Sequence, residues 1–290
     1  MKERILILGG ANSQIPLIKY AKDRGLYVIT ADYLPLNPGH KYAHEYHNVN
    51  TVDKDAILRL AMECKIDAIS SYASDPGAPS AAFVAEQMNL VGSPYRTVEI
   101  LSNKYLFRQF LREKGYPTPW FISGVKKREF QSLDFSQAAV LKPVDSSGSK
   151  GIFRVVNKND FDNYFKRSMA YSRGGRVILE EFIDKKGPQI HGEGFVLNGE
   201  VIFLLLGDQY FSKVNNMAPF STIVPSLFHN DIMSRVHEEV KSLIKDVGYM
   251  TGGINVEAIR DQEDRIFILE IGARNGGNFM PQLIRHTTGF

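Results

Sequence analysis

The chain has 290 residues, of which 43% are hydrophobic, and a formal net charge of +3. This is enough apolar material for a sizeable core, and the length predicts two or three domains. The longest purely apolar run, residues 201–206, is far shorter than the roughly 20 residues that cross a bilayer. The 35 basic and 32 acidic residues nearly balance and form no interleaved basic and aromatic pattern. We therefore expect no membrane and no nucleic acid as a partner.

The N-terminus and the cysteine content indicate the compartment. Only four apolar residues, 5–8, follow Lys2 and Arg4, which is too short for the hydrophobic region of a signal peptide. Cys64 is the only cysteine, so neither a disulfide framework nor a thiolate metal cluster is expected, and its simplest interpretation is a small residue near a helix end. These features favour a cytoplasmic protein.

Strands and helices alternate in the first part of the chain. The expected order is strand 4–8, helix 14–24, strand 27–31, helix 53–64, strand 66–72 and helix 78–88. Such alternation predicts a parallel sheet with crossover helices, and ligands bind at the carboxyl ends of its strands. Gly9-Gly10 and Asp32 lie at two of these ends, as an NAD site would require. The turn lacks the third glycine of G-x-G-x-x-G, so NAD stays a distant alternative and Asp32 can equally be an ordinary strand-end residue.

Residues 94–114 are expected to form one long amphipathic helix that links two domains and carries Lys104. A loop rich in glycine, serine and lysine, residues 144–151, then joins strand 138–143 to strand 152–156. Its backbone N–H groups could converge on phosphate oxygens, and Lys142 could reach them from the opposite side. No Walker A run is present, and a flexible hairpin tip is the alternative interpretation.

A hairpin near the end of the chain brings two acids together. Strands 253–259 and 266–272 alternate apolar residues around a polar turn. If the register places Glu257 opposite or diagonal to Glu270, their Cβ atoms lie roughly 5 to 8 Å apart. Two such carboxylates favour a cation between them, Mg²⁺ or Mn²⁺, and an exposed hairpin with two solvated acids is the alternative. Arg274, just past the second strand, can reach an anion that is bound at this cation.

The remaining elements predict a mostly antiparallel sheet behind a mobile lid. They are strands 176–180, 193–195 and 201–206, the hairpin, and a covering helix, 231–247.

The order and spacing of these parts resemble the ATP-grasp superfamily of ligases, which includes biotin carboxylase, carbamoyl-phosphate synthetase and purine-pathway ligases. The matching segments are Lys104, Lys142-Pro143, Ser146 to Gly151, Glu180 to Ile183, Glu193-Gly194-Phe195, Asn255-Val256-Glu257 and Glu270 to Gly277. The resemblance implies an α/β N-terminal parallel-sheet domain followed by an α+β ATP-grasp fold, with a small lid subdomain and an antiparallel-sheet subdomain. The implied parts are a Rossmann-like domain (1–95), a linker helix (96–117), the lid (118–178) and a C-terminal subdomain (179–290) that is expected to be truncated.

The resemblance also implies roles for individual residues. The cofactor-binding set for ATP would be Lys104, Lys142, Ser146, Ser147, Gly148, Ser149, Lys150, Gly151, Glu180, Glu181, Phe182, Ile183 and Glu193. The lysines would hold phosphates, the serine and glycine loop would close over them, and the 180–183 segment would receive adenine. Glu257 and Glu270 would bind Mg²⁺ or Mn²⁺. Arg274 and Lys142 would be catalytic, since phosphoryl transfer needs positioning and charge neutralisation.

Two positions depart from the family pattern. Gly272 stands where many relatives have an asparagine metal ligand, and Asn275 is a substitute candidate. Gln189 stands where many relatives have an acid that helps to bind the nucleotide.

The resulting hypothesis is an ATP- and Mg²⁺-dependent ligase that converts a carboxylate to an acyl phosphate and joins it to an amine, releasing ADP and phosphate. The alternatives are a bicarbonate-activating carboxylase and an ATP-binding protein without turnover. Homodimer formation stays open. Candidate substrate contacts are Asn12, Ser74, Asp75, Lys213, Asn215 and Asn216.

Overall fold

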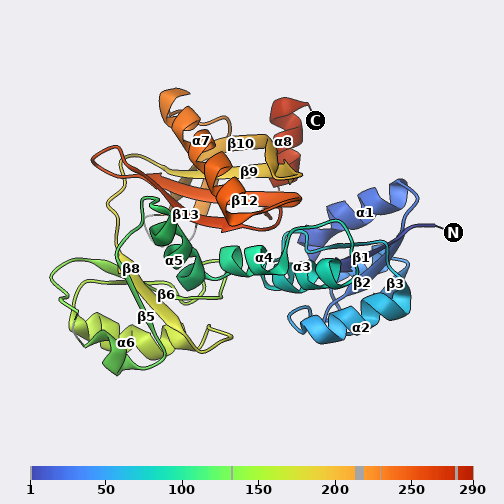
Figure 1. Cartoon of the computed structure of the whole chain (residues 1–290), viewed down its shortest axis with the longest axis horizontal. Coiled ribbons are helices and arrows are strands. Elements are labelled where there is room, and N and C mark those ends of the chain that lie inside the picture. The colour runs from blue at the N-terminus through green and yellow to red at the C-terminus, as the bar shows by residue number, and fades with distance from the viewer. Residues whose placement is uncertain (1, 132, 213–218, 229, 278–279, 290) are drawn as a thin grey trace.

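A computed structural model describes residues 2–131, 133–212, 219–228, 230–277 and 280–289 (Figure 1). It contains one parallel and two antiparallel sheets, and Figure 1 shows each of them as a separate lobe with two helices between the lobes. The expected fold class is therefore confirmed. Within the described ranges, no helix is both long enough and apolar enough to cross a membrane.

The first lobe is a four-stranded parallel sheet in the order β3-β2-β1-β4. Its elements are β1 (Arg4–Leu8), α1 (Ile15–Asp23), β2 (Tyr27–Ala31), β3 (Glu45–His47), α2 (Lys54–Cys64), β4 (Ala68–Ser70) and α3 (Ala78–Gln87). Leu6, Ile7 and Leu8 are fully buried because helices cover both faces of the sheet. The Asp53 side chain caps α2 by accepting the Ala56 N–H at 3.0 Å. The alternation predicted from the sequence is thus present, with β3 as an unpredicted edge strand.

The glycine turn after β1 is held by contacts within the first lobe. A Cβ at Gly10 would collide with the imidazole of His40, which packs against this turn. The Asp32 carboxylate accepts the N–H of Gly10 at 3.0 Å and the side-chain amide of Asn37 at 2.7 Å. It also accepts the N–H of Leu34 at 3.1 Å. Asp32 therefore organises its own loop, which disfavours the NAD alternative.

The segment between the lobes is two helices, α4 (Tyr95–Ser102) and α5 (Lys104–Lys114), and the expectation of one long helix was wrong. Asn103 adopts an extended conformation with φ −123° and ψ 111°. Its side chain accepts the N–H groups of Tyr105 and Leu106 at 3.0 and 3.2 Å and so caps α5. The break places Lys104 at the first position of α5, where its N–H donates to Val144 O at 2.8 Å.

The second lobe, which we call the lid, is an antiparallel sheet in the order β5-β8-β6-β7. Its elements are β5 (Phe121–Gly124), β6 (Ala139–Pro143), β7 (Phe153–Val155), α6 (Lys158–Met169) and β8 (Val177–Glu181). Phe130, Phe161 and Phe165 pack against one another between α6 and the sheet. All of β8 pairs within this sheet, so the lid continues past the expected boundary at residue 178.

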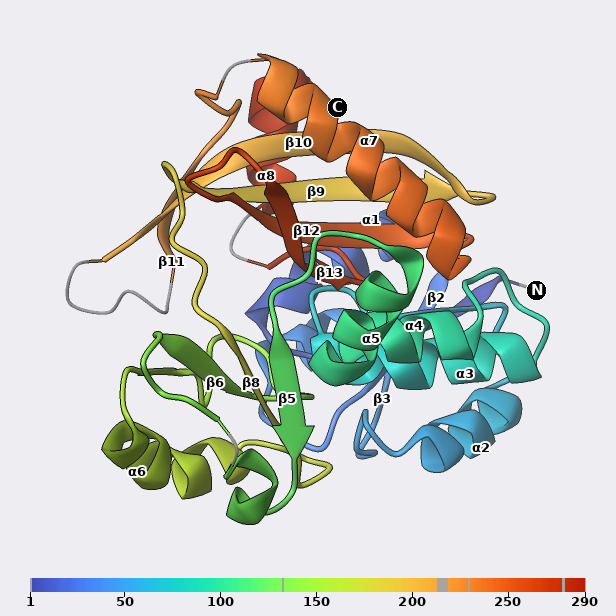
Figure 2. The ribbon, with the colours of Figure 1, turned by 60° about the vertical axis from the view of Figure 1, so that its left-hand side comes forward.

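The third lobe is an antiparallel sheet in the order β11-β10-β9-β12-β13. Its elements are β9 (Gln189–Leu197), β10 (Glu200–Phe211), β11 (Pro219–Ile223), α7 (Asn230–Val247), β12 (Gly252–Arg260), β13 (Ile266–Gly272) and α8 (Met280–Thr288). The helix α7 covers one face and shares a core with Ile254 and Val256 of β12. Figure 2 shows that the lid lies opposite the second face of this sheet, the face that α7 does not cover. Glu257 and its polar neighbours occupy that second face, because side chains alternate along a strand.

Candidate functional site

Two glutamates face each other on adjacent strands at the centre of the site. Glu257 of β12 pairs directly with Glu270 of β13, which is one of the predicted registers. The next pair is Ala258 with Ile268, so Leu269 is an extra residue in β13. This bulge lets consecutive residues, Leu269 and Glu270, both remain partly exposed, whereas strict alternation would bury one of them.

The electrostatics of the pair favour a cation. Burial and the neighbouring Glu270 raise the pKa of Glu257 to about 7. The Glu270 carboxylate lies 3.0 Å from the Lys104 ammonium. Gln189 donates its amide N–H to Glu257 at 3.2 Å and to Gln209 at 3.0 Å. The two acids are therefore incompletely neutralised by the protein, and their oxygens suit a hard divalent cation.

A second charge cluster lies at the lid side of the site. Glu180 is 2% exposed and its carboxylate lies 2.7 Å from Lys142 Nζ and 3.1 Å from Arg108 Nε. Burial alone would raise the pKa of Glu180, but Arg108 and Lys142 lower it to about 2. The side chain expected beside adenine thus holds two cations instead. Arg108, which the sequence reading missed, joins α5 to the lid.

Lys104 connects the two clusters to the loop. Its ammonium lies 3.0 Å from Glu270 and donates to Ser146 O at 3.0 Å. Burial would lower the pKa of Lys104, but Glu270 raises it above its usual value. The loop after β6 then turns through left-handed conformations at Gly148, Ser149 and Gly151, with φ of 65°, 57° and 73°. The loop expected to bind phosphates therefore begins beside both predicted lysines.

A cavity of about 770 Å³ lies between the lid and the third lobe. Lys142, Ser149, Glu257 and Gln189 line its polar side. Its apolar side includes Val140, Ile152, Phe182, Ile183, Ile259 and Leu269. The predicted adenine segment thus lines the same cavity as Lys142 and Glu257.

Two backbone amides of the predicted adenine segment, residues 180–183, are hydrogen-bonded to the lid. The amides of Glu181 and Phe182 donate to Trp120 O at 3.0 Å and to Ala138 O at 3.1 Å. The Phe182 ring lies under the guanidinium of Arg154, 4.4 Å from the ring centroid. These contacts hold one wall of the cavity against the lid sheet.

Arg274 is held by the first lobe. Its guanidinium makes two bonds to Asp75, at 2.6 and 2.9 Å, and its side chain is 13% exposed. Burial would lower the pKa of Arg274, but Asp75, Glu270 and Glu193 raise it. A Cβ at Gly272 would lie 3.3 Å from Arg274 Cζ and 3.4 Å from Asp75 Oδ1, so glycine leaves room for this ion pair.

Glu193 and Asn275 lie elsewhere than expected. The Glu193 carboxylate accepts Gly276 N–H at 2.8 Å and Asn255 Nδ2 at 2.7 Å, and it does not line the 770 Å³ cavity. Burial raises the pKa of Glu193 to about 7. The Asn275 side chain packs on Gly253, which is four residues, or roughly 13 Å of extended strand, from Glu257. Glu193 thus supports the turn after β13, and Asn275 is not placed as a metal ligand.

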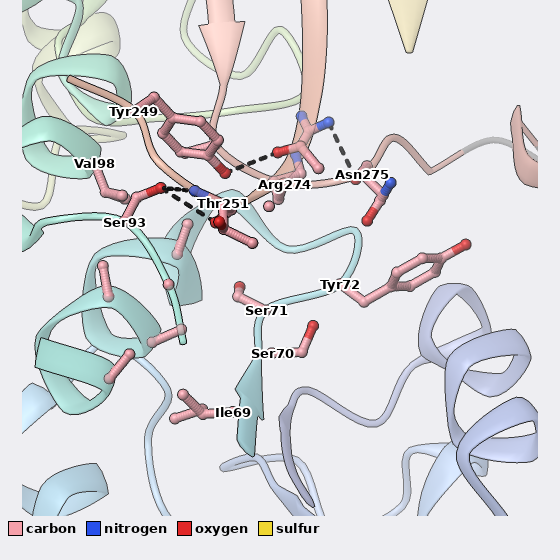
Figure 3. Close-up of a pocket in the computed structure, with 18 of the residues that line it drawn as sticks. Ile69, Ser70, Ser71, Tyr72, Ser93, Val98, Tyr249, Thr251, Arg274 and Asn275 are labelled. Atoms are coloured by element: carbon pink, nitrogen blue, oxygen red, sulfur yellow. Dashed lines mark hydrogen bonds between the residues drawn. The ribbon is translucent and has the colours of Figure 1, made fainter. Parts of the chain in front are cut away.

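A smaller cavity of about 180 Å³ lies between the first and third lobes (Figure 3). Ser70, Ser71 and Tyr72 form one side of it, at the carboxyl end of β4. Thr251 and Arg274 contribute to the opposite side. Among the described residues that line this cavity, Arg274 alone has a charged side chain, and it links the cavity to Asp75, Glu270 and Glu193, the acids that raise its pKa.

A family model described as an ATP-grasp domain matches residues 101–278, more than half of the chain. The chain belongs to the ATP-grasp family. The matched range begins just before Lys104 and ends just after the turn that carries Arg274. It contains both charge clusters, the loop after β6 and the carboxylate pair.

Curated relatives share this region. The chain is 29% identical over 191 residues to a formate-dependent phosphoribosylglycinamide formyltransferase from Rhodococcus jostii, and 30% identical to one from Burkholderia pseudomallei. Each alignment covers 62% of this chain and 46% of the relative. The chain therefore spans about half the length of the curated relatives it matches.

Solved structures share the fold. An L-amino acid ligase from Bacillus licheniformis has a TM-score of 0.80 at 23% identity, over 100% of this chain and 71% of that one. A phosphoribosylglycinamide synthetase from Anaerococcus prevotii has a TM-score of 0.74 at 23% identity, over 98% and 71%. At these identities the likeness shows the ATP-grasp fold alone.

The remaining candidate substrate contacts of this ATP-grasp chain differ in their placement. Asp75 pairs with Arg274, as described above. Asn12 is exposed and neither Asn12 nor Ser74 lines the two cavities. Lys213, Asn215 and Asn216 lie outside the described residues.

Of the residues missed by sequence reasoning, Arg108 carried a signal, because a charge on the apolar face of a helix requires a buried partner.

Proposed function

We propose that this ATP-grasp chain carries the ATP- and Mg²⁺-dependent part of a ligase. It would transfer the terminal phosphoryl group of ATP to a carboxylate, and an amine would then displace phosphate from the acyl phosphate to form an amide. The observation that carries the proposal is a cavity beside a glycine-rich loop that Lys142 and Glu257 line, with Glu270 paired to Glu257 and Lys104 paired to Glu270. This combination supplies the positive charge and positioning that phosphoryl transfer needs.

The two lysines are already partly neutralised, and this supports an exchange of partners. Lys142 pairs with Glu180 and Lys104 pairs with Glu270. A triphosphate would offer both ammonium groups stronger acceptors at the mouth of the cavity. Glu180 would keep Arg108 as its partner, so releasing Lys142 does not leave a buried carboxylate alone. We further propose that the backbone at Ile183 meets adenine, because the two preceding amides are bonded to the lid.

The carboxylate pair fits a divalent cation. Burial and the neighbouring Glu270 raise the pKa of Glu257, and a cation between the two carboxylates would favour their charged forms. Bound between the pair and the nucleotide, Mg²⁺ would neutralise phosphate charge. Gln189 would orient Glu257, as a hydrogen-bonded partner behind a metal ligand does. Gly272 cannot serve as a side-chain ligand.

Arg274 and the smaller cavity provide a place for the acid. The carboxylate to be activated would lie beside Arg274, which Asp75 orients with two bonds. The rest of the acid would enter the 180 Å³ cavity, whose lining side chains, Arg274 excepted, are uncharged. A protein cavity of about 150 Å³ accommodates benzene. We therefore expect an acid with a short uncharged side chain.

The test is ADP release with a panel of acids and amines. Short neutral amino acids with an amine acceptor should stimulate ADP release, and the Glu270→Gln variant should lose it while remaining folded. Stimulation by bicarbonate instead would support a carboxylase. Stimulation by formate with phosphoribosylglycinamide would contradict the expected acid. Tight ATP binding without release under every mixture would refute the ligase proposal.

A further inference from the structure

A second group of metal-ligand side chains lies in the first lobe, outside the ATP-grasp motifs. Glu45 and His47 are two residues apart on β3 and therefore project to the same side of this edge strand. Cys64 ends α2, which packs over that side. Their ligand atoms all lie within 4.8 Å of one another. Figure 1 shows β3 and α2 at the end of the first lobe away from the lid.

We propose that Glu45, His47 and Cys64 form a Zn²⁺ site, with water in the fourth position. Thiolate, imidazole and carboxylate together are typical zinc ligands, and three protein ligands with one water complete a tetrahedron. A thiolate and a carboxylate would neutralise the charge of Zn²⁺. Mg²⁺ and Ca²⁺ are disfavoured because they prefer oxygen ligands.

The distances suit a small adjustment around one ion. His47 Nε2 lies 2.6 Å from Glu45 Oε1 and 3.8 Å from Cys64 Sγ. Ligand atoms around a tetrahedral Zn²⁺ would be roughly 3.3 to 3.6 Å apart, given Zn–N and Zn–S bonds of about 2.0 and 2.3 Å. Glu45 and His47 are about one-third exposed, so their side chains can move and water can reach the open position.

The surroundings prepare Glu45 to bind through one oxygen. Tyr27 donates its hydroxyl to Glu45 Oε2 at 3.3 Å, and Arg4 lies 3.5 Å from the same oxygen. Oε1 is left facing His47. Such partners outside the ligand shell fix ligand orientation. Burial, with Glu45 beside it, raises the pKa of the Cys64 thiol, so binding would release its proton to solvent.

The site would tie the short edge strand β3 to α2. β3 has three residues and, among the described strands, pairs with only one, β2, because it lies at the edge of the sheet. A ligand that binds the folded state adds its binding free energy to stability. Zn²⁺ should therefore raise the unfolding temperature of the first lobe.

The experiment is a titration of the reduced, metal-free full chain with Co²⁺, followed by displacement with Zn²⁺. Cys64 is the only cysteine, so a near-ultraviolet thiolate-to-Co²⁺ band can come from no other residue. We expect a saturable band at one equivalent that Zn²⁺ abolishes. Co²⁺ bound at Glu257 and Glu270 would give no such band. Absence of the band at millimolar Co²⁺ would overturn the proposal.

Variants separate the ligands from their neighbours. Cys64→Ser should lose the band, and Glu45→Gln should weaken Co²⁺ binding by at least about tenfold, since even partners outside the ligand shell cost roughly 10–100-fold. Glu63→Gln is the matched control, because Glu63 is an exposed acid beside Cys64, and it should leave the band unchanged. If the variants unfold, a second measurement on the wild-type chain tests the site. Zn²⁺ should slow maleimide labelling of Cys64, and an unchanged labelling rate would refute the zinc site.

Discussion

Replacing Glu180 with glutamine should destabilise the lid and its junction with α5. The carboxylate is buried with Arg108 and Lys142, whose side chains are 1% and 15% exposed. Lowering the pKa of Glu180 from 4.5 to about 2 corresponds to about 3 kcal/mol of stability at neutral pH, because one pKa unit is worth about 1.4 kcal/mol. Removing one partner of a buried ion pair costs a similar ~3–5 kcal/mol. Glu180→Gln should therefore lower the free energy of unfolding by about 3 kcal/mol.

The pH dependence gives this prediction a distinctive sign. The pKa of Glu180 is lower in the folded state than in the unfolded state, so the unfolded chain binds more protons at intermediate pH. The stabilisation is fully present above pH 4.5 and is lost as the pH falls towards 2. The difference between wild type and Glu180→Gln should therefore shrink with acidification, because glutamine does not titrate.

The assay can follow the lid directly. Trp120 is the only tryptophan and packs against the lid core, so its fluorescence reports unfolding of that lobe in urea. Glu181→Gln is the matched control, because glutamine can still accept the Trp120 N–H, and it should change stability by less than about 1 kcal/mol. A loss below about 1 kcal/mol for Glu180→Gln at neutral pH, or a difference that does not shrink in acid, would refute the reasoning.

Three further predictions concern turnover and Mg²⁺ binding. Arg274→Ala should lower kcat more than ATP affinity, because its charge matters most during transfer, and a defect confined to KM for ATP would contradict that role. Deleting residues 147–149 should raise ATP hydrolysis relative to amide formation if the loop excludes water, whereas unchanged coupling would argue against a lid. Because the pKa of Glu257 is raised to about 7, Mg²⁺ affinity should increase from about pH 6 to about pH 8 as the ligand deprotonates. Glu257→Gln should lose this dependence, measured by calorimetry.

Local patterns predicted much of the framework. Period-two alternation gave two registers that place Glu257 and Glu270 on the same face, and the direct pairing is one of them. The capping preference of aspartate located the start of α2 at Asp53. The same rule applied to Asn103 would have divided the helix expected at 94–114, since asparagine at this position competes with helix continuation.

Local sequence patterns could not predict the long-range contacts. The ion pair between Arg108 and Glu180 joins residues 72 positions apart, and the Arg274–Asp75 pair joins residues 199 apart. The bulge at Leu269 depends on tertiary packing rather than on hydrophobic period. Glu193 matched the family pattern, yet its carboxylate supports the turn at Gly276 rather than the nucleotide cavity.

A crystal structure of the chain with Mg²⁺ and a non-hydrolysable ATP analogue tests the central claim most directly. The account predicts one cation bound by oxygens of both Glu257 and Glu270 at about 2.1 Å. It also predicts Lys104 and Lys142 on the phosphates, with adenine between the lid and the third lobe. A triphosphate bound away from the carboxylate pair, or a cation that contacts neither glutamate, would contradict the account.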